Sequence, residues 1–255
     1  MKKFIFDIDG TLTPSRAQVD PEFKDFLIDF AWATGSYFVT GSDRQKSIEQ
    51  LGEDLYNQAR KVYNCSGSDV YQQSFNAYRR EWELPWEVER FLEDELDYSQ
   101  FVMRNGNHIE RRPGGVNFSI LGRDKDPFKG RAEYIKWDKE RLEREDIADR
   151  IRNAFPGLTV ALGGQTGIDI GPAGSDKSQI LEDEQEFPKD ADIDFYGDRM
   201  EEGENDYTLA QAVKARGGNA YQVNNWQDTW ESLKKIDISL GCDDCMEEFI
   251  PGFHD

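Results

Sequence analysis

Near the amino terminus, short apolar runs typical of strands alternate with stretches whose apolar residues recur at the spacing of a helix. Residues 4–6 form a short apolar run, which is typical of a buried strand. Asp20-Pro21 then supplies an N-cap and a first helical residue, and Gly35 supplies a stop. Between them, apolar side chains recur at helical spacing: Phe23, Phe26, Leu27 and Phe30. A second apolar run over 36–39 precedes a second amphipathic stretch with Ile48 and Leu51. This strand–helix–strand–helix order predicts a parallel sheet.

The pattern changes at about residue 80. The polar, acidic stretch 79–97 predicts a helix and the crossing into another domain. Turn residues at 105–106 and 113–115 predict antiparallel hairpins within 101–122, and a glycine-rich hairpin is expected over 158–170. Between the hairpins a charged helix is expected, with four apolar side chains on one face: Leu142, Ile147, Ile151 and Ala154. Antiparallel strands inside a strand–helix frame predict an inserted cap.

The strand–helix order resumes toward the carboxyl end. We expect a strand over 193–196, a helix over 207–216, a strand over 219–223 and a helix over 226–235. Residues 237–255 form an acidic tail without clear periodicity. The chain is therefore predicted to be an α/β protein with a core domain built from residues 1–80 and 177–255. Residues 81–176 are predicted to form the inserted cap.

Composition excludes several classes of function. The 255 residues carry a net charge of −20, from 51 acidic against 31 basic side chains, so nucleic acid is not an expected partner. No segment approaches the roughly 20 apolar residues of a membrane span, and no signal-like segment follows Met1. Three cysteines are too few for a disulfide framework, which indicates a reducing cytoplasm. Cys242 and Cys245 form a C-x-x-C pair, but with only two histidines in the chain we expect no zinc site.

The first strand ends in a pair of carboxylates, Asp7 and Asp9. Side chains alternate between the faces of a strand, so the two acids would diverge if the strand continued. Gly10 lets the backbone turn, which brings both acids around one point at the carboxyl end of the strand. That arrangement suits covalent phosphoryl transfer, with one carboxylate attacking phosphorus and the other moving protons.

Three further positions fall at strand ends or helix starts of the same frame. Thr40 ends the second strand, Lys177 lies in a turn, and Asp198 precedes Asn205 and Asp206. Oxygen ligands of this kind suit Mg²⁺, while a hydroxyl, the N–H groups of the next helix and a lysine suit a phosphoryl group. Taken singly, each has a structural alternative: a helix cap, a solvated lysine and a turn. Because all three lie at strand ends or helix starts of the same frame, we favour a catalytic role over these structural ones.

These sites resemble the haloacid dehalogenase superfamily of phosphotransferases with a cap of the mixed α/β type. Over roughly residues 1–235 the chain resembles the eukaryotic-type phosphomannomutase family more specifically. Several segments carry this resemblance: residues 7–16; residues 41–43 with Lys46 and 50–52; Arg112 to Arg123 in the cap; residues 163–165 with Asp169, Asp176 and Lys177; and residues 197–206. The resemblance implies a Rossmann-like parallel-sheet core and an inserted α/β cap containing an antiparallel sheet.

The resemblance also implies a role for each matching position. Asp7 would be phosphorylated, and Asp9 would act as the general acid and base. Thr40 or Ser42, together with Lys177, would hold the transferring phosphoryl group. Mg²⁺ would be bound by Asp7, Asp9, Asp198, Asn205 and Asp206. The distal phosphate would be bound by Arg112, Arg123 and Arg131 of the cap, with Arg16 from the core. The sugar or its phosphate would be contacted by Asn117, Ser119 and Asp169. Arg131 matches the family only if one residue is inserted before it.

The activity that the resemblance implies is a Mg²⁺-dependent interconversion of mannose 6-phosphate and mannose 1-phosphate, in mannose metabolism and GDP-mannose biosynthesis. It would proceed through an aspartyl phosphate, with a hexose 1,6-bisphosphate as activator, in a cytoplasmic homodimer joined through the cap. One alternative is a sugar-phosphate phosphatase of the same superfamily with a type IIB cap, and another is a non-catalytic sugar-phosphate binding protein. Arginine forks bind phosphate in two-point fashion, which favours a phosphate ligand in so acidic a chain.

Overall fold

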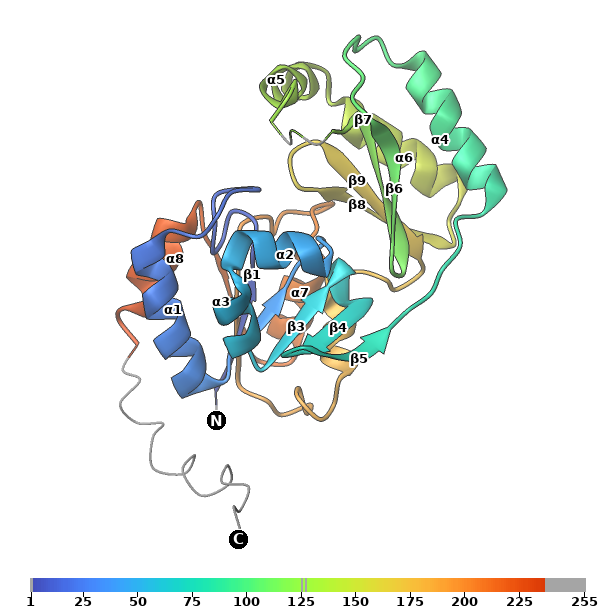
Figure 1. The fold of residues 1–255 in the computed structure, drawn as a ribbon. Helices are drawn as coiled ribbons and strands as arrows, with labels where there is room; N and C mark the ends of the chain where they lie inside the picture. Colours follow the sequence, from blue (N-terminus) through green and yellow to red (C-terminus); the bar gives the residue numbers. More distant parts are fainter. Residues whose placement is uncertain (1, 125, 127, 237–255) are drawn as a thin grey trace, which may run out of the picture.

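The computed structural model of the protein describes residues 2–124, 126 and 128–236. Its larger sheet, at the lower left of Figure 1, has seven strands in the order β11-β10-β1-β2-β3-β4-β5. In chain order these are β1 (Lys3–Asp7), β2 (Tyr37–Val39), β3 (Lys61–Asn64), β4 (Asp69–Gln72), β5 (Phe75–Arg79), β10 (Ile193–Gly197) and β11 (Asn219–Gln222). The five strands from β11 to β3 run parallel, whereas β4 and β5 are antiparallel additions at one edge.

Strand β1 lies in the interior of this sheet. It pairs with β10 through Lys3 to Phe6 and with β2 through Ile5 to Asp7. Because the parallel strands point the same way, the residues that follow β1, β2 and β10 meet at one edge. The parallel core predicted from the sequence is confirmed.

Helices cover both faces of the larger sheet. Phe4 and Phe6 of β1 pack on one side in a cluster with side chains of α1 (Pro21–Thr34), α2 (Arg44–Leu51), α3 (Glu53–Gln58) and α8 (Trp226–Leu233). Ile5 packs on the other side with side chains of α7 (Tyr207–Ala215) and the short 3₁₀ helix η2 (Lys177–Glu182). This division follows from the alternation of side chains along a strand, and it produces three layers.

Helix α1 begins and ends where the sequence predicts. The Asp20 side chain accepts hydrogen bonds from the N–H groups of Glu22 and Phe23, and Pro21 occupies the first helical position. Gly35 closes the helix with φ +63°, a left-handed conformation that favours glycine.

The smaller sheet, at the upper right of Figure 1, has four antiparallel strands in the order β6-β7-β9-β8. Its strands and helices are α4 (Trp86–Tyr98), β6 (Asn107–Arg112), β7 (Gly115–Arg123), α5 (Arg131–Arg141), α6 (Glu143–Ala154), β8 (Leu158–Gly163) and β9 (Gly167–Pro172). The side chains of Val116, Phe118 and Ile120 on β7 pack with the three helices in a hydrophobic cluster of their own. The intervening Asn117 therefore points to the opposite face of the sheet.

The sequence patterns mispredicted or missed several elements. The charged helix does not include Leu142, which has a left-handed φ of +55° and is 56% exposed at the break between α5 and α6. Ala154, expected on its buried face, is exposed, while Ile147 and Ile151 are buried as expected. Helices α3 and α5 and strands β3, β4 and β5 were not predicted, nor was the 3₁₀ turn η1 (Cys65–Gly67).

Two further expectations concern membrane spans and the carboxyl-terminal residues. Across the described residues, the helices are too short or too polar to span a bilayer. Cys242, Cys245 and the acidic tail lie outside the described residues.

Candidate active site

Three carboxylates meet at the carboxyl edge of the larger sheet. Asp7 ends β1, Asp198 follows β10, and Asp206 precedes α7. Each contributes a carboxylate oxygen to a group in which all of these oxygens lie within 4.8 Å of one another. Asp7 and Asp206 are buried, and Asp198 is partly exposed. Such a group of oxygens suits a hard cation that prefers oxygen ligands.

Lys177 lies against this acid group. Its Nζ donates to Oδ1 of Asp7 at 2.5 Å and to Oδ1 of Asp206 at 2.6 Å, and its side chain is fully buried. The lysine begins η2, whose first turn is fixed by Asp176, because the Asp176 side chain accepts from the N–H of Ser178 at 2.8 Å. An ammonium group so placed offsets part of the negative charge of the buried acids.

Burial and mutual repulsion dominate the electrostatics of the acid group. Burial raises the pKa of Asp7 well above its ordinary value, and the neighbouring Asp206 and Asp198 add to that rise against the opposing effect of Lys177. Burial, assisted by Asp206, raises the pKa of Asp198 to about 7. For Lys177, burial acts to lower the pKa, but Asp206 and Asp7 outweigh it and raise the pKa above its ordinary value.

Asp9 lies beside the acid group, with its carboxylate directed elsewhere. Its Oδ1 accepts from the N–H of Arg16 at 2.8 Å and from Nε2 of Gln50 at 3.2 Å. Gly10 makes this turn with φ +85°, and a Cβ there would lie 2.2 Å from Oδ2 of Asp198. The sequence predicts that Gly10 turns the chain so that Asp7 and Asp9 meet around one point; the structure adds that a residue without a Cβ leaves room there for the Asp198 carboxylate.

The loop after β2 supplies hydroxyl groups to the same edge. Oγ1 of Thr40 accepts from the N–H of Ser42 at 3.0 Å, so the Thr40 hydroxyl fixes the turn as well as facing the site. Thr40, Gly41 and Ser42 all line the cavity described next.

A cavity of about 400 Å³ separates this edge from the smaller sheet. The larger sheet contributes the acids and the Thr40 loop, and the opposite wall comes from the polar face of the smaller sheet and its loops. Residues of that wall include Arg112, Asn117, Arg131, Gln165, Thr166 and Asp169. A second cavity of about 300 Å³ shares Arg16, Ser42, Arg131 and Thr166 with the first.

The predicted arginines all line one or both cavities. Arg112 donates from Nη1 to the carbonyl oxygen of Gly41 at 2.6 Å, which links the smaller sheet to the loop after β2. Arg131 donates to Oε1 of Gln165 at 3.2 Å and to Oγ of Ser15 at 3.3 Å. Burial, together with the charge of Arg16, lowers the pKa of Arg131 to about 10.

Of the three positions predicted to contact the sugar or its phosphate, two line the first cavity and one does not. Asn117 donates to Oδ1 of Asp169 at 2.6 Å, and both line the first cavity. Ser119 faces neither of the two cavities: its buried hydroxyl donates to the carbonyl oxygen of Thr166 at 2.8 Å and accepts from the N–H of Gly122. The expected contact between Ser119 and substrate is therefore not available in this conformation, because the hydroxyl fixes the backbone around Thr166.

No individual role was predicted for several polar residues of the site, although residues 50–52 and 163–165 carry part of the family resemblance. Gln50 orients Asp9, Glu110 lies among the arginines, and Gln165 and Thr166 hold Arg131 and Arg123. Gln50 and Lys46 are four positions apart on α2, so a polar stripe on that helix was the available signal. The sequence carried no comparable signal for Glu110, which lies in a run of charged residues.

Known proteins similar to this chain indicate its family. A family model described as eukaryotic phosphomannomutase matches residues 23–239. The phosphomannomutase of Schizosaccharomyces pombe is 34% identical over 244 residues, which cover 91% of this chain and 93% of that protein. The phosphomannomutase of Saccharomyces cerevisiae is 33% identical over 243 residues, covering 91% and 92%.

Solved structures show the same fold at low sequence identity. A haloacid dehalogenase-like hydrolase from Bacteroides thetaiotaomicron has a TM-score of 0.58 and 14% identity, covering 92% of this chain and 99% of that one. An IMP-nucleotidase from Plasmodium falciparum has a TM-score of 0.62 and 15% identity, covering 92% and 67%. From the family match and the relatives more than 30% identical, the chain belongs to the eukaryotic phosphomannomutase family.

Proposed function

We propose that the protein interconverts mannose 6-phosphate and mannose 1-phosphate in a Mg²⁺-dependent reaction. Family membership supports the reaction, and one geometric observation supports the mechanism most directly. Asp7 lies beside Lys177 and two further acids, and it lines a cavity whose opposite wall carries arginines. A hexose 1,6-bisphosphate, which has a phosphate at each end of the sugar, matches this arrangement of acids and lysine on one wall and arginines on the other.

Asp7 is the proposed nucleophile. Its carboxylate oxygen attacks a phosphoryl group of a hexose 1,6-bisphosphate, forming an aspartyl phosphate while the bond between phosphorus and the sugar oxygen breaks. Asp9 gives a proton to that sugar oxygen as it leaves. In the return step a hexose monophosphate attacks the aspartyl phosphate through the hydroxyl at the other end of the sugar, the bond between Asp7 and phosphorus breaks, and Asp9 takes the proton of that hydroxyl. The bond from Gln50 to Asp9 supports a fixed orientation for this acid.

The residues at the edge of the sheet and those of the opposite wall have separate proposed tasks. Lys177, with Thr40 or Ser42, holds the transferring phosphoryl group, where charge placement contributes most to the rate. Arg112, Arg123 and Arg131, with Arg16, hold the distal phosphate. Asn117 and Asp169 contact the sugar. Because the sugar must be held by either phosphate in turn, a second anion site facing Asp7 is what this reaction requires.

The acid group fits a magnesium ion. Asp7, Asp198 and Asp206 present oxygens at suitable spacing, and nearby Asn205 has a buried Oδ1 without a hydrogen-bond partner among the described residues. Asn205 also lines the first cavity, whereas the carboxylate of Asp9 accepts other bonds, so Asp9 would contribute through its main chain. A bound Mg²⁺ would supply positive charge that offsets the crowded carboxylates and the phosphoryl oxygens.

A coupled assay tests the proposal. Mannose 1-phosphate turnover should require Mg²⁺ and a hexose 1,6-bisphosphate, form mannose 6-phosphate and release little free phosphate. Asp7→Asn should abolish turnover, because the amide cannot form the phosphoryl intermediate. Fast phosphate release without formation of the isomer would instead favour the sugar-phosphate phosphatase. Activity unchanged in Asp7→Asn would show that Asp7 is not the nucleophile.

The proposal extends to the organisation of the whole protein. Within the described residues, the predicted core domain comprises 2–80 and 177–236 and the predicted cap lies between them, a division supported by the separate hydrophobic clusters of the two sheets. The rest of the predicted core, residues 237–255, lies outside the described residues. From the family we carry over a cytoplasmic homodimer joined through the cap. Light scattering at micromolar protein concentration should give twice the monomer mass, and a monomer would contradict the dimer.

A further inference from the structure

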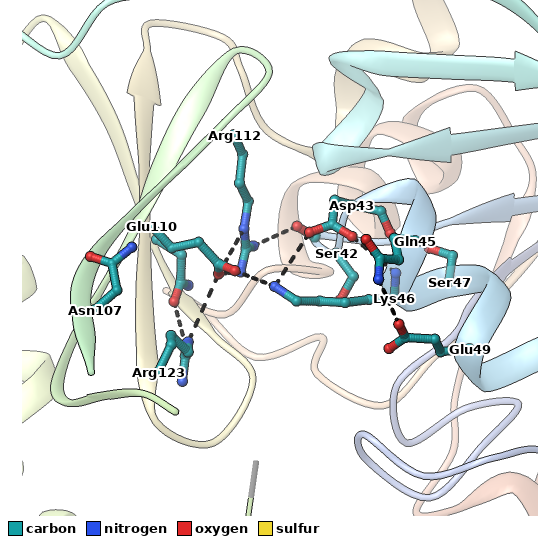
Figure 2. Close-up of polar contacts among 12 residues, drawn as sticks. Ser42, Asp43, Gln45, Lys46, Ser47, Glu49, Asn107, Glu110, Arg112 and Arg123 are labelled. Carbon is teal, nitrogen blue, oxygen red and sulfur yellow. Dashed lines mark hydrogen bonds and ion pairs between the residues drawn. The ribbon is translucent and has the colours of Figure 1, made fainter. Parts of the chain in front are cut away.

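Glu110 lies on β6 of the cap, among the cationic side chains of the second cavity. Figure 2 shows its carboxylate between Lys46 of α2, on the core side, and Arg112 of its own strand. Oε1 accepts from Nζ of Lys46, while Oε2 accepts from Arg112, at 2.5 Å from Nη2 and 3.2 Å from Nε. One carboxylate thus joins the cap to the core and binds an arginine at two points.

The same carboxylate lies near Arg123 but forms no hydrogen bond with its Nε. The two Nη atoms of Arg123 donate to Thr166, at 2.8 Å, and to Asn117. Its Nε is buried and has no hydrogen-bond partner among the described residues, and it lies 3.9 Å from Oε2 of Glu110. A buried donor without an acceptor is costly, so this one is poised for an oxygen that comes closer than the carboxylate does.

Acidic and basic side chains are mixed in this region: Glu49, Asp124 and Asp126 also line the second cavity, and Asp43 lies 3.4 Å from Lys46. Among the described residues, the charged groups in direct contact with Glu110 are nevertheless those of Lys46 and Arg112. Burial, together with Arg16 and Arg112, lowers the pKa of Arg123 to about 9. Burial acts to raise the pKa of Glu110, but Arg112 and Lys46 outweigh it and lower that pKa to about 2. Glu110 is therefore ionised near neutral pH and offsets the repulsion among the cations.

We propose that Glu110 is a positioning residue that takes the place of a substrate phosphate between Arg112 and Arg123, and that it fastens the cap to the core through Lys46 until the anion arrives. The inference rests on the proposed function for the identity of that anion, a phosphate monoester. A phosphate accepts from arginine in the same two-point manner as a carboxylate and carries more acceptor oxygens, so it displaces Glu110 from the arginines and satisfies Nε of Arg123.

Isothermal titration of inorganic phosphate against the full chain tests the competition. Glu110→Gln removes the competing charge but keeps the side-chain size, so phosphate should bind about tenfold more tightly. Both arginines are on the cap, so a looser cap does not remove them from the site. The matched control is Glu89→Gln, because Glu89 pairs with Arg111, the residue next to Arg112, at 2.7 Å in an exposed position of the cap. Unchanged or weaker phosphate binding by Glu110→Gln would overturn the proposal.

Small-angle scattering of the unliganded protein tests the link between cap and core. Lys46→Met keeps Glu110 but removes its partner on the core, so the radius of gyration should rise and phosphate should bind more weakly. Lys24→Met is the matched control, because Lys24 pairs with Asp54 within the core. If neither Glu110→Gln nor Lys46→Met changes the radius of gyration, Glu110 does not hold the cap closed. Lys46→Met also provides a test should Glu110→Gln fail to fold.

These readouts are independent of turnover. Absence of isomerisation in the wild-type protein would contradict the proposed function, whereas phosphate affinity and cap opening would still report on Glu110. Conversely, a normal mutase whose Glu110→Gln variant binds phosphate no more tightly would contradict this inference alone.

Discussion

Asp198 and Asp7 are held in the folded protein with raised carboxyl pKa values. Burial is the main cause for both, and it brings the pKa of Asp198 to about 7 against an ordinary 3.8. Below about pH 7 the Asp198 carboxyl is therefore protonated in the folded protein, and a cation must displace that proton in order to bind.

From this we predict that the apparent Mg²⁺ affinity falls as the pH falls below about 7. The apparent Kd should rise by up to about tenfold per pH unit for each displaced proton. Titration calorimetry with MgCl₂ between pH 8 and pH 5 measures it. Asp198→Asn should bind Mg²⁺ weakly and with a smaller pH dependence, and a pH-independent Kd in the wild type would contradict the assignment.

A second prediction separates the two ends of the substrate. Arg123→Ala should reduce isomerisation by at least about 100-fold, since truncating a buried charged partner costs roughly 3 kcal/mol. Hydrolysis of a small aryl phosphate, which has no distal phosphate, should change by less than about threefold on the same scale. Arg111→Ala is the control, because Arg111 is exposed and pairs with Glu89. Equal loss of both activities in Arg123→Ala would identify the arginine as structural.

Residues at strand ends were predictable, whereas residues within polar runs were not. Asp7 and Asp198 follow strands that hydrophobic periodicity locates, Lys177 lies in a turn that the sequence indicates, and the structure brings all three together. Glu110 lies in a run of charged residues, where the sequence does not distinguish the side chain facing a cavity from the one facing solvent. The face depends on strand register, which only the paired strand fixes.

Substitution of Gly10 tests whether the turn after β1 positions the Asp198 carboxylate. Gly10→Ala would place a Cβ 2.2 Å from Oδ2 of Asp198, and it also puts a side chain at φ +85°. Gly35→Ala meets the same backbone penalty at φ +63°, but its nearest neighbour, Cδ of Arg60, is 3.6 Å away. Each variant should lose about 1–2 kcal/mol of unfolding free energy in urea titrations.

Only Gly10→Ala should also lose Mg²⁺ affinity and activity, because its methyl group displaces the Asp198 carboxylate. Comparable activity in the two alanine variants would show that this turn does not position Asp198.

Elements are predicted best where residues that start or stop a helix mark their ends. Helix α1 has a capping aspartate, a proline and a closing glycine. Strands β3, β4 and β5 follow one another with no α-helix between them, so the alternation of strand and helix that locates β2 and β11 does not mark them. Leu142 is predicted in the charged helix because its side chain is apolar like those of Ile147 and Ile151, and nothing in the local sequence requires a left-handed residue there.

At the scale of the molecule, the two sheets have separate hydrophobic cores. Leu92 is fully buried in the cluster of the smaller sheet, and Leu27 is buried in that of the larger one. Truncation of either to alanine should cost about 2–5 kcal/mol of unfolding free energy at its own site.

Hydrogen exchange should distinguish the two variants. Leu92→Ala should speed exchange within residues 86–172 and leave β1 and β10 protected, and Leu27→Ala should do the reverse, because a separate core can open locally. Equal acceleration across both sheets in either variant would mean that the protein unfolds as one unit and would contradict the division into core and cap.

The interior position of β1 has a consequence for biosynthesis. Strand β1 pairs on one side with β10, whose residues are synthesised 190 positions later, as the register Lys3↔Ile193 shows. The strands of the smaller sheet end at residue 172, so that unit is complete while β1 still has an open edge. Chaperones that bind exposed strands would act on the amino-terminal segment during this interval, and a chain truncated before β10 would carry the nucleophile on an unfinished sheet.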